Sequence, residues 1–203
     1  MNAPMDVFEA METCCAMRHL KADPVPVEAI RRVVHAATRA SNPGNSQGWE
    51  FVILRDREKK AAIGAALREA MHPVLDAMAA DDARPSGKRM YASVKHLLNA
   101  FERVPVHVLV CGRVIYPPLN PLRELVPAAL YPAAQNLIVA ARALGLGTTF
   151  TTYHSMIEPV VREVLELPAD LVLGVMVAMG WPERPFEPVK RKPLDEVLHW
   201  DRW

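Results

Sequence analysis

Four short apolar runs, separated by longer amphipathic stretches, constrain the fold of this chain more than any other feature. These runs have the length and character of β-strands and occupy residues 50–54, 106–111, 147–152 and 171–179. The intervening stretches carry apolar residues at helical spacing, which predicts helices over residues 6–17, 27–40, 57–78, 88–102, 132–144 and 158–165. Strands that are separated by helices in this way predict a central sheet covered by helices.

The size and composition of the chain fit one globular domain. Of its 203 residues, 51% are hydrophobic and 23% are charged, which is enough to build one sizeable core. We therefore expect a single domain over residues 1–203, with a distinct N-terminal segment at residues 1–26. The formal net charge of +1 is too small for a nucleic-acid footprint, so no nucleic-acid partner is expected.

Residues 182–203 are predicted to form an extended C-terminal arm. Proline is frequent in this stretch, and proline disfavours helix interiors and central strands. Four aromatic side chains in or beside the arm need an apolar environment, either in the chain's own core or on a partner subunit. They are Trp181, Phe186, Trp200 and Trp203.

The cysteines and the apolar runs indicate the cellular compartment in which the protein is expected. Cys14, Cys15 and Cys111 are too few, and two of them too close, to make a disulfide framework, which favours a reducing compartment. Residues 1–10 lack the pattern of a signal peptide, and the longest apolar run, residues 171–181, is too short to span a bilayer. We expect a cytoplasmic protein with no membrane partner.

Residues 40–51 place three side-chain amides between a predicted helix and a predicted strand. The sequence there is A-S-N-P-G-N-S-Q-G-W-E-F, and Asn42, Asn45 and Gln47 each offer both donors and an acceptor. Such a loop favours a polar partner, for example a heteroaromatic ring that alternates donors and acceptors. The alternative is an ordinary turn, since the same residue types are common in turns.

Metal and nucleophile motifs are not found in the sequence. The histidines show no paired ligand spacing and there is no C-x-x-C, so no metal site is expected. His107 lies within an apolar run and is interpreted as a core histidine. The serines lack the G-x-S-x-G context, and Cys14 and Cys15 are interpreted as packing residues on a helix face.

Phosphate-binding candidates are scattered along the chain. The stretch from Gly145 to Gly147 lacks a third glycine and follows a helix, so a dinucleotide-binding fingerprint is excluded. Gly147, Thr148 and Thr149 could bring backbone N–H groups close to a flat ligand, or could simply lead from a helix cap into a strand. Anion binding is left to Arg18 and to the arm residues Lys190 and Arg191, each of which could also be a surface charge.

Taken in order, four motifs resemble those of the FMN-dependent nitroreductase family. They are the sequence C-A-M-R at residues 15–18, the amide loop with its Trp at residues 40–49, the helix and glycine pair at residues 133–147, and the closing G-W-P and R-K-P-L-D-E-V at residues 180–182 and 191–197. The resemblance covers nearly the whole chain. It implies an α+β fold, a three-layer αβα sandwich with a mostly antiparallel central sheet. It also implies an intertwined homodimer with exchange of the C-terminal arms.

The resemblance further implies one FMN in each of two sites at the dimer interface. The phosphate would be held by the segment containing Cys15, Ala16 and Arg18, together with Lys190 and Arg191. Asn42, Asn45 and Gln47 would lie along the ribityl chain and the ring, and Gly147, Thr148 and Thr149 near its reactive edge. Cys15 departs from the family, which has Arg there; one lost charged hydrogen bond costs about 1.5–3 kcal/mol, or up to about a hundredfold in FMN affinity.

The implied activity is reduction of a small acceptor, such as a nitroaromatic or a quinone, with NAD(P)H as co-substrate. The flavin carries the chemistry, so no catalytic side chain is named. Possible substrate-lining residues are Tyr91, Phe101, Tyr116 and Tyr153, and residues 81–88 and 116–127 are the expected mobile loops. Three alternatives are a specialised reductive dehalogenase, a non-catalytic FMN-binding or sensor protein, and a structural homodimer that has lost FMN.

Overall fold

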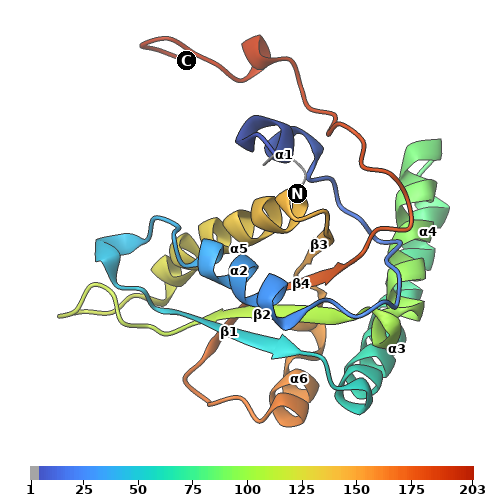
Figure 1. The fold of residues 1–203 in the computed structure, drawn as a ribbon, viewed down its shortest axis with the longest axis horizontal. Helices are drawn as coiled ribbons and strands as arrows, with labels where there is room; N and C mark the ends of the chain where they lie inside the picture. Colours follow the sequence, from blue (N-terminus) through green and yellow to red (C-terminus); the bar gives the residue numbers. More distant parts are fainter. Residues whose placement is uncertain (1–4) are drawn as a thin grey trace.

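A four-stranded antiparallel sheet forms the centre of the molecule (Figure 1). The computed structural model describes residues 5–203. Its strands are β1 (Trp49–Leu54), β2 (Val106–Gly112), β3 (Gly147–Thr151) and β4 (Val172–Gly180), in the spatial order β1-β2-β4-β3. Each neighbouring pair runs antiparallel. The four predicted strands are confirmed, as is the antiparallel sheet that the resemblance implies.

Helices cover both faces of this sheet, which makes the molecule a three-layer αβα sandwich (Figure 1). On one face lie α2 (Val27–Ala37) and α5 (Val126–Ala143), with α1 (Val7–Thr13) beside α5. On the other face lie α3 (Arg57–Asp81), α4 (Pro85–Asn99) and α6 (Glu158–Leu165). Within the described part of the chain, none of the helices is both long and apolar enough to cross a membrane.

The alternation of side chains along β2 explains why both faces need helices. Val106, Val108 and Val110 pack into the core under α2 and α5, whereas Leu109 and Cys111 pack into the core under α3. Every residue of β2 is buried. Burying an apolar side chain of this size contributes about 1.5–3 kcal/mol to stability. Because β2 buries side chains on both of its faces, it contributes to both cores.

The first helix is shorter than predicted, since it ends at Thr13 rather than at residue 17. The following segment is extended instead: Ala16 forms a parallel bridge with Thr148, and the N–H of Met17 donates to the carbonyl of Thr148 at 2.8 Å. This segment satisfies backbone groups along the free edge of β3. Pairing with the sheet therefore overrides the local helical pattern.

The sequence pattern also predicted the wrong start for α5. The helix begins at Val126 instead of residue 132, so Pro127 occupies its first turn and Pro132 lies inside it. Its predicted end is confirmed, because Gly145 follows the cap with φ of 78°, the left-handed conformation that glycine adopts readily. The helix α2 ends at Ala37 rather than at residue 40, α3 extends to Asp81, and α4 begins at Pro85.

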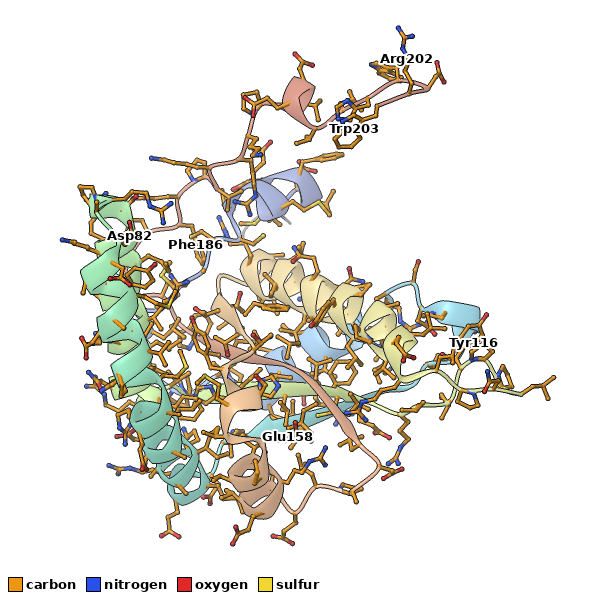
Figure 2. The ribbon with its side chains drawn as sticks, turned by 180° about the vertical axis from the view of Figure 1, so that it is seen from behind. Asp82, Tyr116, Glu158, Phe186, Arg202 and Trp203 are labelled. Carbon is orange, nitrogen blue, oxygen red and sulfur yellow. The ribbon has the colours of Figure 1, made fainter. Side chains whose placement is uncertain are left out.

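The C-terminal arm leaves the body of the molecule (Figure 2). Its base is held by the chain itself, because Phe186 is half-buried and stacks at 3.9 Å on the guanidinium of Arg142. Its end is not: Trp200 and Trp203 are 78% and 99% exposed. Phe186 thus packs on the chain's own surface, and Trp181 packs against the core, whereas Trp200 and Trp203 face solvent.

Candidate functional site

Arg18 lies in the extended segment that follows α1 and is half-buried. Burial lowers the pKa of its guanidinium, and the nearby Tyr153 opposes that shift. Among residues 5–203, no carboxylate lies within ion-pair distance of Arg18. A partly desolvated arginine without an acidic partner is suited to binding an anion.

The segment that carries Arg18 is fastened to β3 by hydrogen bonds on either side of Met17. The N–H of Met17 donates to the Thr148 carbonyl at 2.8 Å, and the hydroxyl of Thr149 donates to the Met17 carbonyl. Gly147 makes room for this contact, since a Cβ there would lie 2.7 Å from Cγ of Met17. Gly147 and Thr149 therefore position the segment that carries Arg18.

The arm brings Lys190 and Arg191 to the same side of the molecule. The N–H of Val189 donates to the carbonyl of Glu12 at 2.7 Å, which places these two cations beside the end of α1. Cys15 is half-buried there and packs with Met17, Leu20 and Phe186. We call this assembly the N-terminal group; its predicted members are Cys15, Ala16, Arg18, Gly147, Thr148, Thr149, Lys190 and Arg191.

The amide loop forms a second, separate group. Oδ1 of Asn42 accepts a hydrogen bond from the N–H of Gln47 at 2.8 Å, so the Asn42 side chain closes the loop. Gly44, Asn45 and Gln47 all have φ between 49° and 58°. Asn45 and Gln47 are exposed and make no side-chain hydrogen bond within residues 5–203, which leaves their amides free for a ligand.

The two groups lie at opposite ends of the sheet (Figure 1). The amide loop precedes Trp49, which pairs with Gly112 at the end of β2; Gly147 pairs with Gly180 at the other end, next to Val106. The length of β2 separates these ends by about 20 Å along the strands, and the three strand spacings add roughly 14 Å across the sheet. One small ligand does not reach both groups within a single chain.

Comparison with known proteins identifies the family. A sequence model described as the nitroreductase family matches residues 13–181. The chain belongs to the nitroreductase family. It is 26% identical to a protein named NADH dehydrogenase from Thermus thermophilus, over 98% of this chain and 100% of that protein. It is 25% identical to iodotyrosine deiodinase 1 of Rattus norvegicus, over 95% of this chain and 68% of that protein.

A solved structure shares the fold of this chain. The crystal structure of oxidised iodotyrosine deiodinase, bound to FMN and 3-iodo-L-tyrosine, superposes with a TM-score of 0.78. The match covers 98% of this chain and 100% of the other, at 16% identity. The expected family and fold class are thus confirmed.

Two of the four predicted substrate-lining side chains lie in the core of the protein. Tyr91 is 7% exposed, with its hydroxyl 3.4 Å from Asp82, and Phe101 is 4% exposed and stacks on His107 at 3.8 Å. Phe101 lines only a small internal cavity, which it shares with Tyr153. Tyr116 and Tyr153 are half-buried and lie against the amide loop and near Arg18, respectively. Of the four, only Tyr116 and Tyr153 lie next to the amide loop or the N-terminal group.

His107 is a core histidine, as its place in an apolar run predicts. Its Nε2 lies 2.9 Å from the carbonyl of Phe101, and the ring is 1% exposed. Burial lowers the pKa of His107 to about 4, so the ring is neutral at physiological pH. Its role is to pack in the core.

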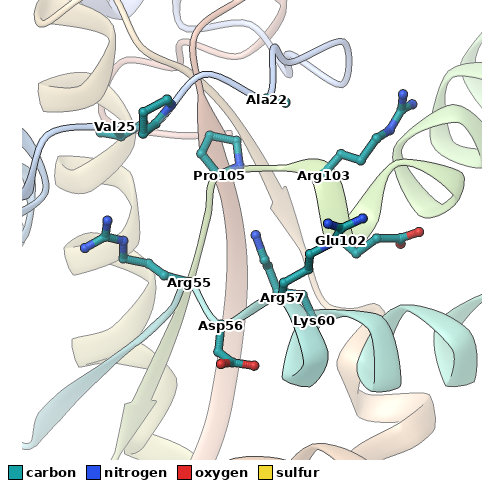
Figure 3. Close-up of a pocket in the computed structure, with 10 residues that line it drawn as sticks. Ala22, Val25, Arg55, Asp56, Arg57, Lys60, Glu102, Arg103 and Pro105 are labelled. Carbon is teal, nitrogen blue, oxygen red and sulfur yellow. The ribbon is translucent and has the colours of Figure 1, made fainter.

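A cavity of about 760 Å³ lies outside both predicted groups (Figure 3). Its walls combine apolar and mainly cationic side chains: Ala22, Pro24, Val25, Arg55, Asp56, Arg57, Lys60, Glu102, Arg103 and Pro105. None of these residues is among the predicted site residues. They come from three segments that meet only after β1 and β2 pair, and no short motif marks them.

Proposed function

We propose that this protein is an FMN-dependent oxidoreductase that uses NAD(P)H to reduce a small acceptor, such as a nitroaromatic or a quinone. Membership of the nitroreductase family supports the reaction class. The observation that carries the proposal is the half-buried Arg18, which has no carboxylate partner in residues 5–203. It offers a fork of N–H donors to a phosphate.

The residues present fit FMN in their chemistry. Arg18, Lys190 and Arg191 would hold the phosphate, and the amides of Asn45 and Gln47 would bind the ribityl chain and the ring. Asn42 would act indirectly, because its amide shapes the loop. When bound, FMN supplies the hydride chemistry. The protein's residues bind and orient the reactants, and no side-chain acid or base is assigned.

The separation of the two groups supports a homodimer. One FMN contacts both groups only if the amide loop of one protomer faces the N-terminal group of its partner. The exposed Trp200 and Trp203 of the arm, residues 182–203, would then be covered by the other protomer. This assembly makes the partner copy part of each site.

The visible spectrum with added FMN, before and after anaerobic NAD(P)H, tests the proposal. We expect a protein-bound flavin spectrum that bleaches on reduction and returns when a nitroaromatic or quinone is added. Bound FMN that stays oxidised would instead favour the non-catalytic binding or sensor role. No bound FMN, even with Cys15→Arg, would favour the structural homodimer.

Reductive dehalogenation is the second candidate, because several relatives are named iodotyrosine deiodinase. In that reaction two electrons from NAD(P)H and a proton replace a carbon–halogen bond with a carbon–hydrogen bond, and halide leaves. Halide release from a halogenated phenol should be compared with nitroaromatic reduction under the same conditions. Faster turnover of the halogenated phenol would favour this candidate, and the reverse would favour the general reductase.

A further inference from the structure

Three potential metal ligands from distant parts of the chain meet at the base of the C-terminal arm. His19 follows Arg18, His96 lies on α4, and Glu183 begins the arm. Their donor atoms all lie within 4.8 Å of one another. Figure 1 shows the segment after α1 and the start of the arm passing beside α4. None of the three is among the residues predicted to hold FMN, and His19 directly follows Arg18 in the chain.

Protein contacts leave the donor atoms of this cluster unsatisfied. Nδ1 of His19 is 4.0 Å from the Glu183 carboxylate, which is too long for a hydrogen bond. The rings of His19 and His96 stack with centroids 3.9 Å apart. Within residues 5–203, none of the three side chains makes a hydrogen bond. Two imidazoles and a carboxylate thus lie close together, and none of their nitrogen or oxygen atoms has a hydrogen-bond partner within residues 5–203.

The backbones that carry the three ligands are held in place. The N–H of Glu183 donates to the carbonyl of His19 at 3.0 Å, and Leu20 pairs with Pro182. His96 lies on α4 beside Leu97, which is 4% exposed. The side chains of His19 and His96 are partly exposed, so the rings can rotate while their backbones stay in place. Anchored backbones with mobile side chains are suited to capturing an ion.

We propose that His19, His96 and Glu183 form a binding site for a divalent transition-metal ion, for which Zn²⁺ is the best match. Zinc takes imidazole nitrogen and carboxylate oxygen at about 2.0–2.2 Å, which places ligand atoms about 3.4 Å apart in a tetrahedron. The stack must therefore open, and donor atoms that lie up to 4.8 Å apart must draw together by up to about 1.4 Å. The fourth position is open to water.

The ligand types and the surrounding charges favour a transition-metal ion that binds imidazole, and they disfavour a hard cation such as Mg²⁺ or Ca²⁺. The charge of Arg184 opposes any cation, and Glu183 offsets it. Mg²⁺ and Ca²⁺ need several oxygen ligands, whereas Zn²⁺ gains from the two imidazoles. A bound ion would tie the N-terminal segment and the arm to α4.

Zinc titration of the full-length protein tests this site directly. The protein carries no polyhistidine tag, is treated with a chelator, and is titrated with Zn²⁺ by calorimetry. We expect one Zn²⁺ per chain, with binding weakened at least about tenfold in His19→Ala, His96→Gln and Glu183→Gln. His35→Ala, a matched change of an exposed histidine on α2, should bind as the unchanged protein does. X-ray absorption should show nitrogen and oxygen ligands at about 2.0–2.2 Å.

Thermal unfolding gives a second readout that does not depend on flavin. Zn²⁺ should raise the Tm of the unchanged protein and leave that of His96→Gln unaltered, while the two share a Tm without metal. Failure to bind Zn²⁺ would overturn the proposal. So would Zn²⁺ binding that survives His96→Gln, or sulfur ligands together with loss of binding in Cys14→Ser/Cys15→Ser.

Discussion

Replacing Arg18 with Gln tests the proposed phosphate contact at the scale of one residue. The change removes a charge-assisted hydrogen bond, which contributes about 1.5–3 kcal/mol, so FMN should bind about 10- to 100-fold more weakly. Quenching of FMN fluorescence measures the affinity. Arg31→Gln, on an exposed position of α2, is the control and should bind FMN normally. Equal affinity in the two variants would remove Arg18 from the site.

For Cys15→Arg, in the same segment as Arg18, we expect the opposite effect on FMN affinity. Cys15 is half-buried beside the segment that carries Arg18, where the family motif has an arginine. A second guanidinium should strengthen FMN binding by about 10- to 100-fold. The same fluorescence titration measures the gain, and a weaker or unchanged affinity would show that the phosphate lies elsewhere.

Gly44 is a residue for which backbone and packing both demand glycine. Its φ is 58°, and a Cβ would lie 2.2 Å from Cε2 of Tyr116. Gly44→Ala should lower the free energy of unfolding by about 1–3 kcal/mol. Gly145→Ala is the matched control, because its φ is 78° but nothing lies within 4 Å of its Cβ position. Urea unfolding should show the larger loss for Gly44→Ala; equal losses would mean that the Tyr116 contact contributes nothing.

At the scale of elements, the hydroxyl of Thr149 donates one of the hydrogen bonds that attach the N-terminal segment to β3. Thr149→Val removes the hydrogen bond to the Met17 carbonyl and should cost about 1 kcal/mol. The Met17 amide should then exchange its hydrogen faster. Thr151→Val removes a longer bond, 3.3 Å to Met176, from the same strand and should leave Met17 exchange unchanged. Unchanged exchange in Thr149→Val would contradict the fastening role.

At the scale of the whole molecule, buried histidines should make the fold sensitive to acid. The pKa of His107 is about 4 in the folded chain and about 6.5 in an unfolded one. The unfolded state therefore binds more protons between these pH values, and stability falls there by about 1.4 kcal/mol per pH unit. Burial also lowers the pKa of His154, which acts in the same direction.

Urea unfolding at several pH values measures this dependence. The free energy of unfolding should be constant above pH ~6.5 and decrease towards pH ~4. His107→Gln should show a smaller slope, whatever its stability at neutral pH. An identical slope in the variant would assign the acid sensitivity to other groups.

The proposed homodimer is a further property of the whole molecule. Deleting residues 194–203 removes the exposed Trp200 and Trp203 and should weaken the dimer. Light scattering as a function of protein concentration measures the dissociation. The double variant Trp200→Ala/Trp203→Ala separates the aromatic contacts from the length of the arm. A dimer of unchanged stability in both would show that the arm does not hold the partner.

Local patterns predicted most of the fold and part of the candidate site. All four strands, the end of α5 at Gly145 and the core position of His107 follow from hydrophobic periodicity and turn residues. The predicted starts and ends of helices were less accurate. For example, α1 ends at Thr13, because the residues that follow it pair with β3 and so satisfy backbone groups that a longer helix would have paired internally.

The sequence by itself determined which elements form and which residue types could hold an anion or a flat ring. These properties depend on neighbours along the chain, within one or two turns. Only the tertiary structure decided that Gly147 and Thr149 hold Met17, that the amide loop lies far from Arg18, and that His19, His96 and Glu183 meet. Such contacts depend on strand order and on the path of the arm, which join segments that carry no common local signal.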